Sequence, residues 1–265
     1  MTSHNYTHGR STSGYCATIL FLNIMKLLAL LATLCYPLLA AKPVLIVSDG
    51  APIRILAVQL KAHGVQSETM SEETMPANLS SYPAVLVYVH SVLAAPAEQA
   101  YMAYANAGGK LIVLHHSISS QKRQNPNWLA FLGVKLPEGD VSEGGYKFYD
   151  PVNLTLVNLA PKDWITTHDV HWESRAEYRG EDHDAIQLPA TEVYVNHVLE
   201  GPRTVLLGFK FREEKSGVAY TQDTAAWYKK AGKGWVMYFM AGHSGKEFED
   251  PAYAQILVNA VNFRP

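Results

Sequence analysis

Three apolar runs that each end near a histidine constrain the fold of this chain more than any other feature of its sequence. In Gly108–Ser119, GGKLIVLHHSIS, a glycine pair precedes an apolar run and two adjacent histidines, His115 and His116. A short β-branched run bounded by turn residues is typical of a strand that is buried on both faces of a parallel sheet. Two further runs, AVLVYV and WVMYFMA, are followed by His90 and, one residue further on, by His243.

The ends of these runs are expected to lie together. Parallel strands of an α/β sheet bring their carboxyl ends to one edge, where diverging loops open a crevice for ligands. If the three runs are neighbouring parallel strands, four imidazoles gather along one rim of the sheet. Each histidine alone is explained by a hydrogen bond to a loop, but the set predicts a functional site, because such sites are built from several strand ends.

The rest of the chain alternates strands and helices as an α/β fold does. Residues 42–49, KPVLIVSD, predict a strand that ends in Asp49, and residues 53–62 predict the helix after it. A helix after Pro96, a strand over TVLLGFKF, two strands joined by GKG and a helix over Pro251–Phe263 complete the pattern. Asp49 is expected at the same rim, either as a ligand contact or as a helix cap.

Residues 135–200 interrupt this alternation. The segment is rich in glycine, histidine and acidic residues, and loops added over the rim of a rigid sheet commonly carry specificity. We expect a lid-like insertion or wall over the site, with residues 191–196, TEVYVN, as its most ordered part. Upstream of it, Trp128 either closes over a sugar ring or anchors its segment in the core.

Composition and missing motifs exclude several classes of protein. The chain has 265 residues, 48% hydrophobic, which is enough to bury one globular core. A net charge of -2 and the lack of a basic run exclude a nucleic-acid footprint. No dinucleotide or Walker A motif is present, and Ser244 in GHSGK lacks the second glycine of a nucleophile elbow.

Residues 1–41 read as a leader. They contain no Asp or Glu and end in LLALLATLCYPLLAA, which follows Met25 and a lysine. This is typical of a cleavable secretory signal, and the proline-interrupted run is too short for a permanent membrane span. We expect an exported protein, periplasmic or secreted, that starts at Met25 and keeps residues 42–265 as one domain. Its cysteines, Cys16 and Cys35, are both in the leader, so a cysteine nucleophile is excluded.

The remaining chemistry is that of histidines and carboxylates. Imidazoles in a cleft can move protons during isomerisation, elimination or hydrolysis of a sugar, with Glu192 or Asp49 orienting one of them. A divalent metal such as zinc is the alternative. Its ligands would come from His168, His171 and Glu173 with the EDHD cluster, or from the rim histidines.

With these residues in view, the chain resembles the ThuA-like family, named for trehalose utilisation, of the class I glutamine amidotransferase-like superfamily. The likeness covers residues 42–265 and is carried by VLIVSDG, YANAGGKLIVLHHS, EVYVN and AAWYKKAGKGWVMYFMAGHS with DPAYAQILVNAVNF. It implies a flavodoxin-like, doubly wound, mostly parallel sheet with helices on both faces. It also implies a role in sugar metabolism without thiol-dependent glutamine hydrolysis, because histidines stand at the amidotransferase cysteine position.

The resemblance also suggests roles for particular residues. By motif match, the catalytic candidates are His115 or His116 as the proton shuttle, His243 as its partner and Glu192 as the orienting carboxylate. The substrate-binding candidates are Tyr194, from the same match, and Asp49, His90 and Trp128, from the residue pattern itself.

Three departures from the family pattern point to a changed substrate or to a sugar-binding relative that lacks catalysis. Thr191 replaces an aspartate, Trp235 replaces an arginine, and the histidine often found after the first strand is absent. A non-catalytic glycan-binding protein is therefore the alternative to a sugar-processing enzyme.

Overall fold

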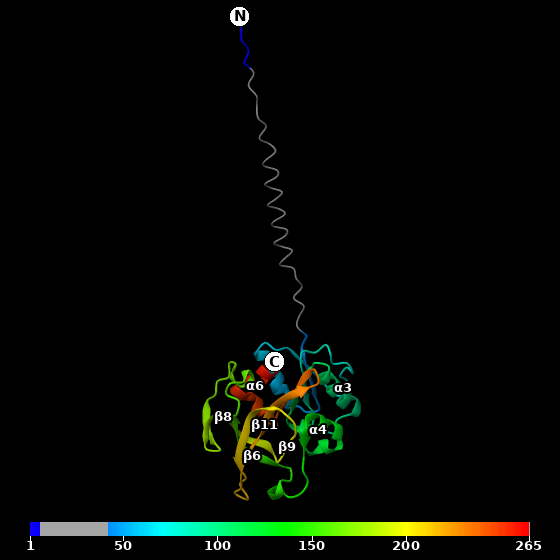
Figure 1. Ribbon diagram of the computed structural model, residues 1–265, viewed down its shortest axis with the longest axis vertical. Coiled ribbons are helices and arrows are strands. Elements are labelled where there is room, and N and C mark those ends of the chain that lie inside the picture. Colours follow the sequence, from blue (N-terminus) through cyan, green and yellow to red (C-terminus); the bar gives the residue numbers. More distant parts are fainter. Residues whose placement is uncertain (6–41, 265) are drawn as a thin grey trace. The chain divides into compact units, whose positions relative to one another are not determined.

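The computed structural model describes residues 1–5 and 42–264 of the chain (Figure 1). Most of the expected leader, residues 6–41, lies outside the described residues, so cleavage, export and a start at Met25 stay predictions. In the described part of the chain, no helix combines the length and the apolar character needed to cross a bilayer.

A ten-stranded mixed sheet runs through residues 42–264 in the order β2-β1-β3-β4-β12-β11-β10-β6-β8-β7. The parallel strands are β1 (Val44–Ser48), β2 (Ser67–Met70), β3 (Val85–Tyr88), β4 (Lys110–Leu114) and β12 (Gly234–Phe239). The antiparallel strands are β6 (Lys147–Asn158), β7 (Ser174–Tyr178), β8 (Glu181–Val195), β10 (Thr204–Arg212) and β11 (Ala219–Ala231). The expectation of a mostly parallel sheet is therefore wrong for its second half.

The central parallel strands form where the apolar runs predicted them. Every residue of β3 is buried, and so is β4 from Leu111 to Leu114. A strand that is buried on both faces needs apolar side chains at successive positions, which explains the unbroken runs. A separate short pair, β5 (Val134–Lys135) and β9 (Val198–Leu199), lies outside the large sheet.

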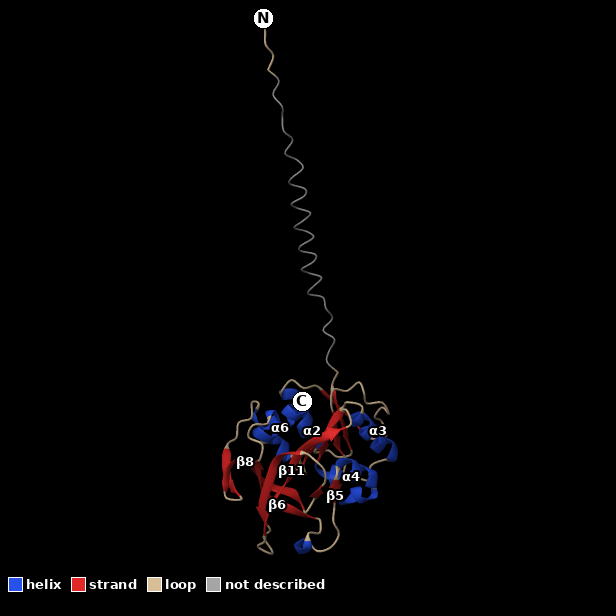
Figure 2. Ribbon diagram, in the orientation of Figure 1, coloured by secondary structure: helices blue, strands red, loops and turns tan. Residues whose placement is uncertain are grey.

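The helices of the described residues pack in two groups. Their bounds are α2 (Ile53–Ala62), α3 (Ala95–Asn106), α4 (Pro126–Leu132), α5 (Trp164–Thr167) and α6 (Pro251–Asn262). Helix α6 contacts both α5 and α2, and helix α3 contacts α4. The α2–α6 pair and the α3–α4 pair lie apart in Figure 2. Helix α6 begins at Pro251, as expected, and the Asp250 side chain before it caps the backbone N–H of Tyr253.

Short 3₁₀ turns lie at loops of the fold. They are η1 (His115–Ile118), η2 (Ser120–Gln124), η3 (Val141–Glu143) and η4 (Lys246–Glu249). The turn η1 follows β4 without a break, so the two adjacent histidines leave the sheet edge in a tight turn.

Three strands within residues 135–200, expected as a lid-like insertion or wall, belong to the large sheet: β6, β7 and β8. Strand β6 pairs with β10 on one side and with β8 on the other. The alternating apolar residues of VNLTLVN suit a strand with one buried face, and that pairing leaves the segment as a wall of the domain. It brings Glu192 and Tyr194 of β8 to the carboxyl rim of the parallel strands.

The glycine pairs noted in the sequence let two turns approach closely. The backbone N–H of Lys233 donates to the carbonyl of Asn106, and that of Trp235 donates to the carbonyl of Gly109, both at 3.0 Å. A Cβ atom on Gly234 would lie 2.2 Å from the carbonyl oxygen of Gly109, so only glycine fits.

We expect Gly234→Ala to lower the free energy of unfolding by about 1–3 kcal/mol, because the added methyl group overpacks this contact. Urea denaturation of the variant and its parent measures the difference. Equal stability would show that β12 moves away freely, which would contradict the tight approach of these turns.

His197 is a buried histidine that packs against Tyr146 and Tyr194. His197 stacks on Tyr146 with ring centroids 5.3 Å apart and lies 5.6 Å from the ring of Tyr194. Within residues 42–264, neither of its ring nitrogens has a hydrogen-bond partner, and burial lowers the pKa of His197 to about 3. The ring is therefore neutral in the folded chain at pH 7, and it supports Tyr194 as a packed aromatic.

This histidine makes the fold sensitive to acid. Unfolding restores a pKa of about 6.5, so stability is full above that pH and falls as the pH drops from about 6.5 toward about 3. The loss attributable to His197 is about 2 kcal/mol at pH 5. We expect His197→Phe to remove that part of the loss, as measured by urea denaturation at pH 7 and pH 5. The exposed control His171→Phe should leave it in place, and an unchanged acid response in His197→Phe would contradict the assignment.

Candidate functional site

The three histidine-ended strands are parallel neighbours, as the sequence predicts, so their following loops meet at one rim. The imidazole centroids of His115 and His116 lie 4.1 Å apart, and His90 lies 4.5 Å from His116. The ring of His243 lies 5.5 Å from each of the adjacent pair. The rim therefore carries a contiguous cluster of four imidazoles.

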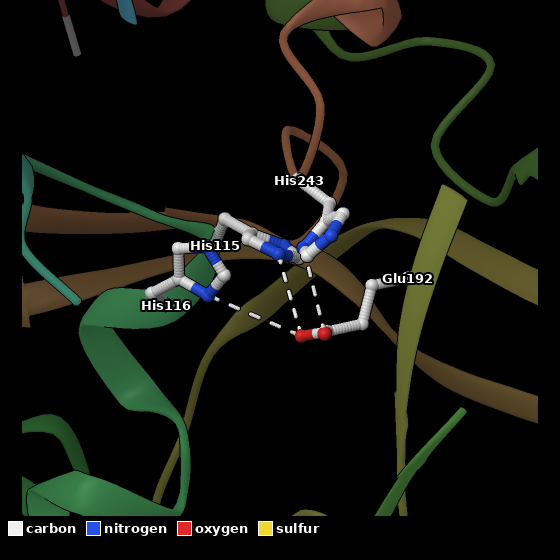
Figure 3. A group of neighbouring side chains, drawn as sticks. All are labelled: His115, His116, Glu192 and His243. Carbon is white, nitrogen blue, oxygen red and sulfur yellow. Dashed lines mark ion pairs between the residues drawn. The ribbon is translucent and has the colours of Figure 1, made fainter. Parts of the chain in front are cut away.

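Strand β8 adds a carboxylate to this cluster (Figure 3). The Oε1 atom of Glu192 lies 3.5 Å from His115 Nε2 and 3.9 Å from His116 Nδ1, and its Oε2 atom lies 3.5 Å from His243 Nδ1. Burial raises the pKa of Glu192, but the hydrogen bonds and charges of its neighbours, above all His115, leave that pKa below its ordinary value. Glu192 is therefore an ionised, buried carboxylate at neutral pH.

His115 is held in one orientation. Its backbone φ is 43°, in the left-handed region that a histidine adopts only under constraint, at the first position of η1. Its Nδ1 atom is hydrogen-bonded to the carbonyl of Met240. Because a carbonyl oxygen only accepts, Nδ1 carries the hydrogen, and Nε2 faces the Glu192 carboxylate and the Tyr194 hydroxyl.

Tyr194 links the two adjacent imidazoles. Its hydroxyl oxygen lies 3.0 Å from His116 Nδ1 and 3.2 Å from His115 Nε2. Burial, with the charge of Glu192, raises the pKa of Tyr194, so the hydroxyl stays protonated. Burial and the neighbouring imidazoles lower the pKa of His116, which is neutral at pH 7. The hydroxyl can therefore donate to either ring.

His243 forms the solvent side of the cluster. Its side chain is 32% exposed, and its Nε2 atom lies 3.7 Å from Asp150 Oδ2 while Nδ1 faces Glu192. The imidazole thus stands between two carboxylates and connects the buried groups to the surface. Sequence reasoning missed Asp150, because it falls inside β6 without a motif around it.

The other expected contacts have structural roles. The carboxylate of Asp49 accepts hydrogen bonds from the backbone N–H groups of His90 and Ser91 and from the Ser91 hydroxyl, at 2.7–2.9 Å. It therefore fixes the loop after β3, while His90 itself is exposed at the rim. Trp128 is fully buried and donates from Nε1 to the carbonyl of Ser117, so it anchors its segment and does not face a sugar. Tyr194 is also buried and contacts histidines, so it is not an open ring wall.

Lys122 is a buried residue that sequence reasoning did not identify. Its ammonium donates to the carbonyl oxygens of Val89, His90 and Ser91, and burial lowers the pKa of Lys122 to about 8. Lys122 therefore binds the backbone carbonyl groups of the loop after β3, whereas Asp49 binds backbone N–H groups of the same loop. Lysine is usually exposed, so nothing in the sequence marks this position.

One side-chain group in the described residues could hold a metal ion. Its ligand atoms come from His115, His116, Glu192 and His243 and lie within 4.8 Å of one another. The other set considered from the sequence, built on His168, does not form such a group among the residues that the structure describes.

The geometry can be compared with that of solved structures. No curated protein matches the chain. A ThuA-like protein from Bacteroides uniformis ATCC 8492 has 19% identity and a TM-score of 0.57, over 85% of this chain and 93% of that one. β-Galactosidases from Rahnella sp. R3 and Bacillus circulans sp. alkalophilus have 12% and 13% identity and TM-scores of 0.52 and 0.54. The two alignments cover 83% and 84% of this chain but only 31% of each β-galactosidase chain. At these sequence identities, the similarity shows a shared fold and nothing about function.

The family assignment rests on sequence. The family model described as trehalose utilisation, ThuA, matches residues 44–264, which include every strand and helix of the domain and all residues of the cluster. The chain therefore belongs to the ThuA family.

Proposed function

We propose that this chain binds a sugar or keto-sugar at the histidine rim and processes it by acid–base chemistry. The observation that carries the proposal is an ionised carboxylate, Glu192, within 3.9 Å of ring nitrogens from three imidazoles. Such a cluster can take a proton from one carbon or hydroxyl of a sugar and return one to another. The trehalose-utilisation description of the family supports a carbohydrate as the substrate class.

The surroundings of each side chain suit it to a different chemical role. Burial and the neighbouring imidazoles lower the pKa of His116, so this neutral ring suits a hydrogen-bond contact with a sugar hydroxyl more than it suits a base. His115 Nε2 lies beside Glu192, whose charge would stabilise an imidazolium formed there. The hydroxyl of Tyr194 connects these two rings, and the exposed face of His243 exchanges protons with solvent.

Two further expectations belong to this proposal. The pattern of residues 1–41 supports export to the periplasm or beyond, where a sugar would be met outside the cytoplasm. The order β2-β1-β3-β4-β12 of the parallel strands supports a doubly wound, flavodoxin-like arrangement in that half of the sheet, with the site at its carboxyl rim.

The isosteric variant Glu192→Gln tests the acid–base proposal. We expect turnover to fall by about 10²-fold or more, because the charge that stabilises an imidazolium is lost while the shape is kept. Affinity for the same sugar should change by less than about threefold. Trehalose, other disaccharides and their keto derivatives would be assayed for turnover and, by calorimetry, for binding.

The exposed control Glu138→Gln should match the parent in both measurements. A parent that binds a sugar and turns over none of the panel would contradict the enzyme and support a glycan-binding protein instead.

A divalent metal centre is the second candidate, and a specific observation favours it. The oxygen atoms of Glu192 lie 3.5, 3.9 and 3.5 Å from the three nitrogens. In a tetrahedral zinc site with bonds of about 2.0–2.1 Å, neighbouring ligand atoms are about 3.4 Å apart. The other ring nitrogen of His115, Nδ1, donates a hydrogen bond to the carbonyl of Met240, as the second ring nitrogen of a metal-binding histidine commonly does. A bound metal would supply a Lewis acid for a sugar oxygen.

Elemental analysis of tag-free protein, purified without chelator, tests this candidate. We expect about one equivalent of zinc or another divalent ion per chain, a lower melting temperature after chelation, and loss of the metal in His243→Ala. His168→Ala, which alters an exposed histidine outside the group, should keep the metal. A metal-free protein whose melting temperature is unchanged by added zinc would contradict the metal centre.

A further inference from the structure

A hollow of about 820 Å³ opens beside the histidine cluster, between the beginning of β6 and the turn that joins β10 to β11. Its lining includes Lys147, Phe148, Asp150, Glu213, Lys215 and Tyr220. No residue of the acid–base cluster described above lines it except the flanking Asp150. Pockets of this size hold ligands larger than one sugar ring.

Asp150 connects this groove to the cluster. Its carboxylate lines the hollow and also lies 3.7 Å from His243 Nε2. A ligand whose reacting ring contacts His243 would therefore extend past Asp150 into the groove. The two sites share one wall and can hold adjoining parts of one molecule.

Phe148 gives the groove an open aromatic face. This residue is 54% exposed, although phenylalanine is usually buried. In the β6–β8 pairing it stands directly opposite Tyr194, and it lines the hollow together with Asp150. An exposed aromatic ring next to a polar cluster offers a flat apolar surface for the C–H face of a sugar.

The charges around Phe148 suit a neutral, hydroxyl-rich ligand. Lys147 and Lys215 are balanced by Asp150 and Glu213, so the groove has no net charge that would select an anion or a cation. Carboxylates accept hydrogen bonds from hydroxyl groups, and ammonium groups donate to them. The turn itself is ordered, since the Glu213 carboxylate accepts hydrogen bonds from the backbone N–H groups of Lys215 and Ser216.

We propose that this groove binds the second ring of a disaccharide or longer glycoside, with Phe148 as its stacking surface. The inference rests on the proposed function, because the first ring occupies the histidine rim. It assigns a place to the second ring, on the far side of Asp150 from His243. It also gives Phe148 the ring-contacting role that the buried Trp128 and Tyr194 do not fill.

Calorimetric titration of the full chain with a panel of monosaccharides and of the α- and β-linked disaccharides built from them, trehalose included, tests this assignment. The parent should bind one or more disaccharides at least about tenfold more tightly than the component monosaccharide. Phe148→Ala should abolish that preference and leave monosaccharide affinity unchanged, whereas Phe148→Trp, which keeps an aromatic face, should retain it.

Trp164→Ala, which removes a partly exposed aromatic outside the groove, is the matched control and should bind as the parent does. Equal affinity of the parent for mono- and disaccharides, or a disaccharide preference that survives in Phe148→Ala, would overturn the groove and leave the rim site standing. A parent that binds no sugar of the panel would overturn the proposed function and the groove together. A melting temperature for each variant confirms that the binding changes occur in folded protein.

Discussion

The buried charge of Glu192 is the constraint on which the rest of the site depends. A carboxylate removed from water is costly unless hydrogen bonds or opposite charges compensate it, and here ring nitrogens of three histidines surround its two oxygens. Those histidines come from the parallel half of the sheet and Glu192 from the antiparallel half. The cluster therefore exists only when both halves are joined through β12 and β11, which links the fold to the site.

A second buried carboxylate aligns the two halves at this point. Glu247 accepts hydrogen bonds from the hydroxyl of Thr191, the residue before Glu192, and from the hydroxyl and backbone N–H of Ser244, the residue after His243. Burial raises the pKa of Glu247, but these hydrogen bonds leave that pKa below its ordinary value. Thr191 thus has a structural part, because through Glu247 it links the strand that carries Glu192 to the loop that carries His243.

The sequence predicted the parallel half of the fold and strands β10 and β11 of the other half, but it missed how β6, β7 and β8 extend the sheet. Strand β4 lies on the apolar run before the two adjacent histidines, and the three histidine-ended strands are neighbours, because buried parallel strands leave unbroken apolar runs and their carboxyl ends meet. Strands β6 and β8 have mixed polar faces and long irregular pairings with register shifts, so residues 135–200 resembled an insertion. Asp150, Phe148 and Lys122 could not be found, since their roles come from contacts between segments far apart in the chain. Trp128 was a candidate that the structure places in the core, because a large aromatic residue looks the same in the sequence whether it packs in a core or lines a binding site.

The most direct test of the account is nuclear magnetic resonance of the full chain with ¹⁵N-labelled histidine rings, before and after addition of the disaccharide that binds most tightly. In the free protein, His115 should carry its hydrogen on Nδ1, as the contact with the Met240 carbonyl requires. On addition of the sugar, the ring signals of His115, His116 and His243 should shift, while those of the exposed His63 and His171 stay in place. Sugar binding that leaves the three rim histidines unchanged would contradict the claim that this cluster is the functional site.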